Sequence, residues 1–407
     1  MVSRRQFVLG AAVAVCGLIL PPASNFASLE VRGRELGVIP DTNQSMTSAL
    51  RNALEILAAA GGRLLLEPGT YLVGPLTLPA GTSLIAMGRV VLAAERATSS
   101  WLKVGAGHYP AILQGLQLDS RDRALDHVLR VPSGAGLVMK ACKIRANGKC
   151  HGVSVVPGAR VVDITSTAID GTHTAIYIRG SISAVSLAAV HVTRWRQRGI
   201  AFIADENGGA SNVRLTNCRV DPPTPGGTVR QPISFTANNI GRFRNVTITY
   251  CKVTGTAASY LAPGNAGVAD LISLHRCELF SISNNVCAFG GDMGITVAQG
   301  CRRGIILDNL CRDNDSCGVA VGSAASAERT TDVLISGNTM TGNGRDRIGK
   351  RSTAARAQLW LYNVSDVSIE QNLFDRTGSR IVNGAAAPPI SRRHARDVYV
   401  AAGQKGL

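Results

Sequence analysis

A short apolar pattern recurs along the chain at an interval of 23 to 24 residues, and it constrains the fold more than any other feature. Pairs of apolar residues two positions apart return at Val153/Val155, Ile176/Ile178, Ile200/Phe202, Ile233/Phe235, Ile272/Leu274, Ile295/Val297, Val319/Val321 and Leu359/Leu361. The steps between them are 23, 24, 33, 39, 23, 24 and 40 residues, so the longer steps contain insertions. A period of two indicates strands, and a repeat this short buries its apolar face only by stacking on its neighbours.

A second row of apolar pairs follows the first within each repeat. It comprises Val162/Ile164, Val185/Leu187, Val213/Leu215, Val246/Ile248, Phe280/Ile282, Ile305/Leu307, Val333/Ile335 and Val367/Ile369, and many of these are followed by an asparagine, at Asn217, Asn285, Asn309, Asn338 and Asn372. Asparagine tolerates the left-handed backbone of tight turns and can stack its amide on an equivalent residue in the next coil. The pattern predicts an all-β fold, a single-stranded right-handed parallel β-helix of about ten coils spaced about 4.8 Å apart.

The segment before the repeats predicts a cap for this solenoid. Residues 42–60 have the period of an amphipathic helix, with Met46, Leu50, Leu54 and Leu57 on one face, and Gly61-Gly62 ends it. A helix over the open end of a strand stack blocks edge pairing. We therefore divide the chain into a leader (1–27), a cap with the first coils (28–100), the β-helix (101–375) and a closing segment (376–407).

The amino terminus resembles a bacterial twin-arginine signal. Ser3-Arg4-Arg5-Gln6-Phe7 precedes an apolar run that ends near Leu20, before Pro21-Pro22. The resemblance implies a periplasmic or secreted protein. No other long apolar segment occurs, so we expect no integral membrane segment after signal removal.

The opening of the repeats resembles the pectate-lyase-like β-helix superfamily. Asp41-Thr42, the predicted helix, Gly61-Gly62 and Leu66-Glu67-Pro68-Gly69-Thr70-Tyr71 carry this likeness. Together with the twin-arginine pattern, it also resembles a group of uncharacterised, twin-arginine-exported β-helix repeat proteins. In this scaffold substrates lie along the first strand row, in a cleft walled by inserted loops, and function depends on the residues grafted there.

The charge balance favours an anionic partner. Lys and Arg number 43 against 27 Asp and Glu, a net charge of +16 that falls to +14 when the two arginines of residues 1–27 are removed. Such a field attracts acidic glycans, anionic surfaces or nucleic acid. Export and the lack of a nucleic-acid motif argue against nucleic acid, so we expect an anionic polysaccharide.

Acids precede the first-row strand in three consecutive repeats. Asp270, Asp292 and Asp315, with Asp313, would lie within one or two coil spacings, roughly 5 to 10 Å. That range suits paired carboxylates for glycoside hydrolysis or a Ca²⁺ site in a lyase. Turn capping is an equally simple interpretation.

The same acids give a faint resemblance to family-28 polygalacturonases. Asp270 and Asp292 match that family's first acids, but Met293 replaces the second Asp of its pair and Cys317 replaces the His of its Gly-His-Gly. The Asp-Pro-His-Asp signature of mannuronan epimerases is absent. For a lyase, His275, Arg276 and Tyr260 are candidates for the base that removes a proton next to a uronate carboxylate.

Other candidates concern substrate binding. The outward positions of the first row are Ser154, Tyr177, Ala201, Ser234, Ser273, Thr296, Ala320 and Trp360. Tyr177 and Trp360 can stack on sugar rings, and Arg196 and Arg198 can clamp an acidic sugar. Asp205 is either a second acidic site or a turn. Insertions near 205–230, 252–270 and 340–357 would wall the cleft, and the last contains Arg345, Arg347, Lys350, Arg351 and Arg356.

Several cysteines fall one repeat apart. The pairs are Cys277 and Cys301, Cys287 and Cys311, and Cys218 and Cys251. Adjacent coils bring such residues within disulfide range, and the periplasm permits oxidation. A column of buried thiols is the alternative.

These observations predict an exported enzyme that cleaves an acidic, uronate-containing polysaccharide by lyase or glycosidase chemistry. Asp270, Asp292, Asp315 and His275 would be catalytic, and Ca²⁺ is a candidate cofactor. A non-catalytic glycan-binding protein of exopolysaccharide handling and a uronate epimerase remain as alternatives.

Overall fold

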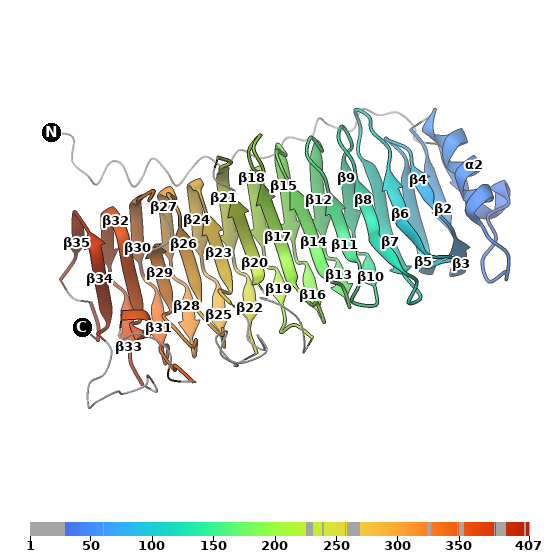
Figure 1. The fold of residues 1–407 in the computed structure, drawn as a ribbon. Helices are drawn as coiled ribbons and strands as arrows, with labels where there is room; N and C mark the ends of the chain where they lie inside the picture. Colours follow the sequence, from blue (N-terminus) through green and yellow to red (C-terminus); the bar gives the residue numbers. More distant parts are fainter. Residues whose placement is uncertain are drawn as a thin grey trace.

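The chain forms one elongated rod of stacked coils (Figure 1). A computed structural model describes residues 29–407 apart from 60, 225–230, 238–239, 257, 259–268, 324–326, 348, 350–353, 378, 380–387, 403 and 407. Within that part, 35 strands pair in parallel as one continuous sheet that winds around the rod. The predicted parallel β-helix is confirmed.

The rod has three faces, each a ladder of strands from successive coils. The first face comprises β4 (Leu76–Leu78), β6 (Thr98–Val104), β8 (Leu125–Val131), β11 (His151–Val155), β14 (Thr174–Arg179), β17 (Arg198–Ala204), β20 (Gln231–Ala237), β23 (Ile272–His275), β26 (Ile295–Ala298), β29 (Val319–Gly322), the first half of β32 (Leu359–Glu370) and β34 (Ile390–Ala395). The second comprises β1 (Glu30–Arg32), β2 (Arg63–Leu66), the first halves of β5 (Ser83–Ala94) and β7 (Ala111–Asp119), β9 (Leu137–Lys140), β12 (Val161–Thr165), β15 (Ala184–Ala188), β18 (Ser211–Thr216), β21 (Phe243–Thr249), β24 (Cys277–Ser283), β27 (Arg302–Leu307), β30 (Thr330–Ser336), the second half of β32 and β35 (Val398–Val400). The third comprises β3 (Gly69–Val73), the second halves of β5 and β7, β10 (Lys143–Arg145), β13 (Ala168–Asp170), β16 (His191–Thr193), β19 (Arg219–Val220), β22 (Lys252–Thr254), β25 (Val286–Ala288), β28 (Leu310–Arg312), β31 (Thr339–Thr341) and β33 (Leu373–Asp375). Parallel pairing thus continues beyond residue 375, through β34 and β35.

The first face has the register that the repeat predicts. Val153 pairs with Ile176, Ile176 with Ile200, and the same column continues through Ile233, Ile272, Ile295, Val319 and Leu359. These side chains are buried in the core. The rings of Phe202 and Phe235 stack in successive coils with centroids 4.3 Å apart.

The second face departs from the prediction at β27. Gly304 and Ile306 face the core there, and Ile305 and Leu307, the predicted pair, point outward. Phe280 in the preceding coil explains the shift, because a Cβ on Gly304 would lie 1.9 Å from the Cζ of that ring. The aromatic ring fills the volume that a branched residue would need.

A ladder of amides runs through the turns after the second face. The Oδ1 of Asn309 accepts hydrogen bonds from the backbone N and Nδ2 of Asn285, each at 3.0 Å. Asn338 accepts in the same way from Asn309, Asn372 from Asn338, and Gln404 ends the ladder. Asn217 is not a member: it is exposed with φ of +54°, and its neighbour Cys218 is the buried residue of that turn.

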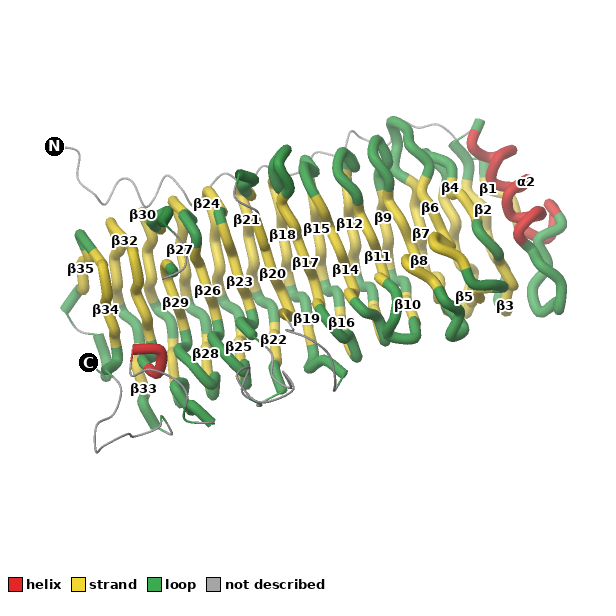
Figure 2. Tube along the Cα trace, in the orientation of Figure 1, coloured by secondary structure: helices red, strands yellow, loops and turns green. Residues whose placement is uncertain are grey.

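The amino-terminal end of the rod is capped by one helix, α2 (Thr47–Ala58), beside a 3₁₀ turn, η1 (Gly33–Leu36) (Figure 2). Leu50, Leu54 and Leu57 are buried against the first coils, as predicted. A short 3₁₀ turn, η2 (Ala354–Arg356), lies near the other end. No helix of the described residues is long and apolar enough to cross a membrane.

The opening motif locks the cap to the first coil. Asp41 accepts a hydrogen bond from the Thr70 backbone N at 2.8 Å, and Tyr71 Oη donates to the Glu67 carbonyl at 2.9 Å. Gly69 has φ of +139°, and a Cβ there would lie 2.5 Å from the Pro40 side chain. Glycine is therefore required where the two segments cross.

The nine cysteines of the described residues are all buried free thiols. The candidate disulfides Cys218–Cys251, Cys277–Cys301 and Cys287–Cys311 are therefore not present, although Cys287 and Cys311 pair directly across adjacent coils. The thiols instead bond to backbone groups, as Cys301 does to the Leu274 carbonyl at 3.4 Å. Burial raises the pKa of Cys301 to about 12, so these residues act as small core side chains.

Candidate active site

The outer side of the first face carries a row of mostly small residues. Ser154, Tyr177, Ala201, Ser234, Ser273, Thr296, Ala320 and Trp360 pair in this order along successive strands. The small members are buried, whereas Tyr177 and Trp360 are half-buried. Neighbouring groups therefore cover the small residues, in the place where the sequence predicts the substrate.

A cluster of aromatic and cationic side chains covers the amino-terminal part of this face, and we call it the histidine–tyrosine cluster: His127, His151, His173, Tyr177 and Arg198. The ring of His151 stacks on Tyr177 with centroids 4.9 Å apart and on His127 at 5.4 Å. His173 meets His151 edge-on at 5.9 Å. The first three strands involved, β8, β11 and β14, are neighbours in the ladder, and β17 adds Arg198, which pairs with Thr174.

The cluster combines a neutral imidazole with a cation two coils along the same face, because His151 pairs with Thr174 and Thr174 with Arg198. Burial, together with the nearby His127 and His173, lowers the pKa of His151 to about 4. Burial also lowers the pKa of Arg198, against the opposing effect of Tyr177 nearby. Arg198 is half-buried and makes no ion pair with the described residues. A buried, unpaired guanidinium favours an anionic ligand.

Tyr177, Arg196 and Arg198 were predicted from the sequence, whereas the three histidines were not. His127 and His151 are 24 residues apart and pair in register, so the coil period would have placed them in one column, whereas His173 stands one residue before Thr174, the partner of His151. Arg196 lies at the border of the cluster: its backbone N donates to the His173 carbonyl at 3.3 Å, and its guanidinium covers Gly148.

Asp270 belongs to the same face, farther along the rod. Arg198 pairs with Gln231, and Gln231 and Asp270 each stand two residues before the paired Ile233 and Ile272. Asp270 therefore lies about two coil spacings from Arg198, or roughly 10 Å. Asp292 is close by, because Asp292 and Asp270 both raise the pKa of the buried Cys317 thiol.

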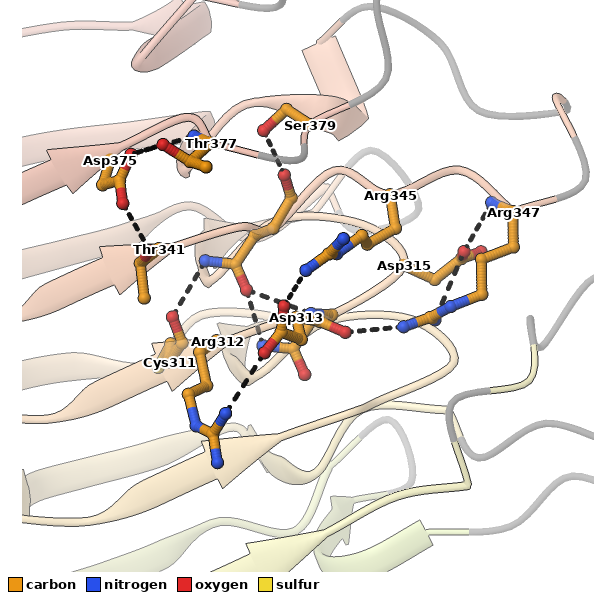
Figure 3. Close-up of polar contacts among 12 residues, drawn as sticks. Cys311, Arg312, Asp313, Asp315, Thr341, Arg345, Arg347, Asp375, Thr377 and Ser379 are labelled. Carbon is orange, nitrogen blue, oxygen red and sulfur yellow. Dashed lines mark hydrogen bonds and ion pairs between the residues drawn. The ribbon is translucent and has the colours of Figure 1, made fainter.

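Asp315 has a different environment from the one predicted. It is fully buried, and its Oδ1 accepts the backbone N of Arg347 at 2.7 Å and lies 3.4 Å from the Arg347 guanidinium. Figure 3 shows that Asp313 is likewise bonded to Arg312 and Arg345. Asp315 and Asp313 fasten the insertion after β31 to the preceding coil, and the Asp315 carboxylate is engaged in these contacts.

The arginines of that insertion are correspondingly engaged. Arg345 pairs with Asp313, and Arg347 also donates to the Asp313 carbonyl at 2.7 Å. Arg356 is 3% exposed. Lys350 and Arg351 lie outside the described residues. Arg345 and Arg347 thus bind groups of the preceding coil, whereas the sequence suggested that this insertion binds a glycan.

His275 and Arg276 face different surroundings although they are adjacent. His275 lies half-buried at the end of β23, where its Nε2 is 3.2 Å from Ser273 Oγ and burial lowers its pKa to about 4. Arg276 has φ of +52° at the corner after this strand and pairs with Glu328 at 3.0 Å. Arg276 therefore contributes to a corner ion-pair network with Arg242 and Glu328. Tyr260 lies outside the described residues.

Two further candidates are separate from the cluster. Asp205 closes a tight turn, where it accepts the backbone N of Asn207 at 3.0 Å, which favours the turn interpretation. Trp360 lies in the same row as Tyr177 but six coils away, at roughly 29 Å, and its ring meets Tyr362 at 5.9 Å.

The candidate calcium site stays a prediction. In the part of the chain that the structure describes, no three or more His, Cys, Asp or Glu side chains form a group suited to a metal ion. Such a group is not formed by Asp270, Asp292 and Asp315, because the Asp315 carboxylate accepts a hydrogen bond from the Arg347 backbone N in the insertion loop.

Comparison with protein-family profiles and with curated proteins finds no match. Among solved structures, the A-module of the Azotobacter vinelandii mannuronan C-5 epimerase AlgE4 is similar, with a TM-score of 0.54 and 16% identity over 91% of this chain and 99% of that one. The Streptococcus pneumoniae surface adhesin PfbA has a TM-score of 0.52 and 10% identity over 87% and 93%. The Yersinia enterocolitica family-28 exopolygalacturonase has a TM-score of 0.43 and 11% identity over 93% and 79%. The chain thus has the right-handed parallel β-helix fold, which an epimerase module and an adhesin share.

Proposed function

We propose that the chain is a polysaccharide-processing enzyme that removes the proton next to the carboxylate of a uronate residue, on the outer side of the first face. The observation that carries the proposal is the half-buried Arg198, which makes no ion pair with the described residues and lies near Tyr177. Tyr177 in turn stacks on the neutral His151, two coils from Arg198. The chemistry requires a cation for the carboxylate, a base and a proton donor.

Each residue of the cluster has a role in this reaction. Arg198 binds the carboxylate and stabilises the negative charge that develops when the adjacent C–H bond breaks. His151, neutral above pH of about 4, accepts the proton. Tyr177 donates a proton to the glycosidic oxygen as the C–O bond breaks and the C=C bond forms, or to the carbanion itself. The first outcome is a lyase reaction and the second is epimerisation.

Hydrolysis by paired carboxylates is less well supported. Only Asp270 and Asp292 remain of the three predicted acids, since Asp315 is buried beneath the insertion loop. The non-catalytic alternative rests on the small residues of the outward-facing row. Export to the periplasm is a separate proposal that rests on the amino-terminal twin-arginine pattern alone.

The test is turnover by the chain lacking residues 1–27 on polygalacturonate, alginate and neutral polysaccharides. Ultraviolet absorbance of unsaturated ends, reducing ends and the configuration at C5 are followed together. Unsaturated ends identify a lyase, and a changed C5 configuration identifies an epimerase. Binding without any of these products would indicate a glycan-binding protein instead of an enzyme. Reducing ends alone would indicate hydrolysis, with Asp270 and Asp292 as the catalytic acids.

Two variants connect the activity to the cluster. We expect Arg198→Ala to lower kcat/KM by about 10- to 100-fold, the value of a charge-assisted hydrogen bond, and His151→Gln to lower kcat. Arg214→Ala is the matched control, because Arg214 is an exposed arginine on the second face. Equal losses in all three variants would argue against the assigned site.

A further inference from the structure

A hollow lies away from the first face, on the third face at the amino-terminal end of the rod. It has a volume of about 490 Å³ and is lined by residues of the loop at 41–43 and of β3, β5, β7 and β10. A neighbouring hollow of about 300 Å³ shares three of its residues: Asp119, Arg121 and Arg145. The lining of the larger hollow is mostly polar, which distinguishes it from the apolar pockets that hold most small ligands and suits a hydrophilic ligand.

The floor follows from the register of the third face. Leu72 pairs with Ala93, Ala93 with Asp119, and Asp119 with Arg145, so these side chains form one row across four coils. The parallel row contains Val91 and Gln117. A narrow apolar strip is thus bordered by planar polar groups, which suits the apolar faces and the hydroxyl rims of sugar rings.

Three arginines surround this floor without ion pairs. Arg89 reaches it from the wide turn inside β5, Arg121 from the turn after β7, and Arg145 from the end of β10. None of them makes an ion pair or a side-chain hydrogen bond with the residues that the structure describes. In the strand ladder, the backbone of Arg145 is in register with Asp119 and Asp170. The side chain of Asp170 nevertheless pairs with Arg194 and leaves Arg145 without this partner.

Two carboxylates of the hollow accept hydrogen bonds from backbone N–H groups. Asp41 accepts the Thr70 N, and Asp119 accepts the Arg121 N, each at 2.8 Å. These bonds fix the positions of both acids and orient the turn that presents Arg121. The arginines are left to meet an external anion, and the second oxygens of the carboxylates can accept sugar hydroxyls.

We propose that this hollow is a second glycan-binding site, which takes a segment of an acidic oligosaccharide by its carboxylates through Arg89, Arg121 and Arg145. It lies on a different face from the histidine–tyrosine cluster and needs no catalytic step. A long chain held here would be kept beside the rod while another segment occupies the first face.

The experiment measures binding in a background that lacks the first-face site. Tetrasaccharides of galacturonate, mannuronate and glucuronate are titrated calorimetrically into the Tyr177→Ala, Arg198→Ala chain. We expect at least one of them to bind and the added changes Arg121→Ala and Arg145→Ala to weaken it by about tenfold or more. The carboxyl-reduced form of the same tetrasaccharide should not bind.

Arg214→Ala in the same background is the control, with folding checked by circular dichroism for every variant. Hydrogen exchange should show protection at residues 41–43 and 117–121 on binding. Absence of binding by all three tetrasaccharides overturns the proposal, as does an equal loss with Arg214→Ala. Because the background lacks Tyr177 and Arg198, failure of the proposed activity does not affect this result.

Discussion

Replacing Asn309 by alanine tests whether the amide ladder holds the coils together. Asn309 is 1% exposed and makes four side-chain hydrogen bonds: its Oδ1 accepts from Asn285 N and Nδ2, and its Nδ2 donates to the Ile282 carbonyl and to Asn338 Oδ1, all at 2.9 to 3.0 Å. Alanine removes all four and deprives the buried Asn285 N–H of this acceptor. At about 1 to 3 kcal/mol for each buried group left unsatisfied, we expect a loss of about 3 to 5 kcal/mol.

The loss of stability in Asn309→Ala should also be confined to one part of the rod. In a repeat fold each coil contacts only its neighbours, so the loss should be concentrated in the adjoining coils. Hydrogen exchange of residues 277–312 and denaturant unfolding measure the local and the global part. Asn309→Cys is the matched variant, because Cys218 and Cys251 occupy the equivalent turns of earlier coils, and it should lose less than alanine. If Asn309→Ala costs no more than Thr339→Ala on the neighbouring half-buried strand, the ladder is not a source of stability.

Three further changes test separate parts of the structure. The pKa values of His151 and His275 are each lowered from 6.5 to about 4, so the unfolded chain binds protons between these values that the native chain does not, and stability should fall as pH falls through this window. His151→Gln should reduce that slope in pH-dependent unfolding and leave the part due to His275. The acid limb of the activity should lie near pH 4, and a limb near 6.5 would refute the assignment of His151 as base. Gly304→Val should destabilise the chain by about 1 to 3 kcal/mol or more by overpacking against Phe280, and Phe280→Ala in the same chain should restore part of the loss in a double-mutant cycle; additive losses would exclude the contact. Asp315→Asn should increase proteolysis of the loop that Arg347 fastens and leave kcat within about twofold, whereas a large loss of kcat with an intact loop would return Asp315 to the catalytic set.

The fold was predictable because its cause is local. A strand alternates its side chains with a period of two, and one slip in register would move the whole apolar set to the wrong side. The spacing of Ile176, Ile200 and Ile233 therefore fixes both the strands and their pairing. The one wrong pair, Ile305/Leu307, arose because a glycine faces the core there, and no periodicity marks the ring of Phe280 that fills its place.

The candidate site was predictable only in part. Tyr177 and Arg198 stood out by residue type and position, and the coil period would have added His127 and His151. The contacts of Asp315 and Arg345 depend on how an insertion folds back onto the coil before it. They could not be predicted, because insertions lie outside the repeat.

The solenoid, its capped end and the outward-facing row thus follow from the sequence alone, because period and burial are properties of each strand and its neighbours. Only the tertiary structure decided which charges cancel and which remain. Asp313 and Asp315 form ion pairs with arginines, whereas Arg198 and the arginines around Asp119 form none with the described residues. The physical reason is that ion pairing depends on a few ångströms between groups from different coils, and that distance is set by turns and insertions.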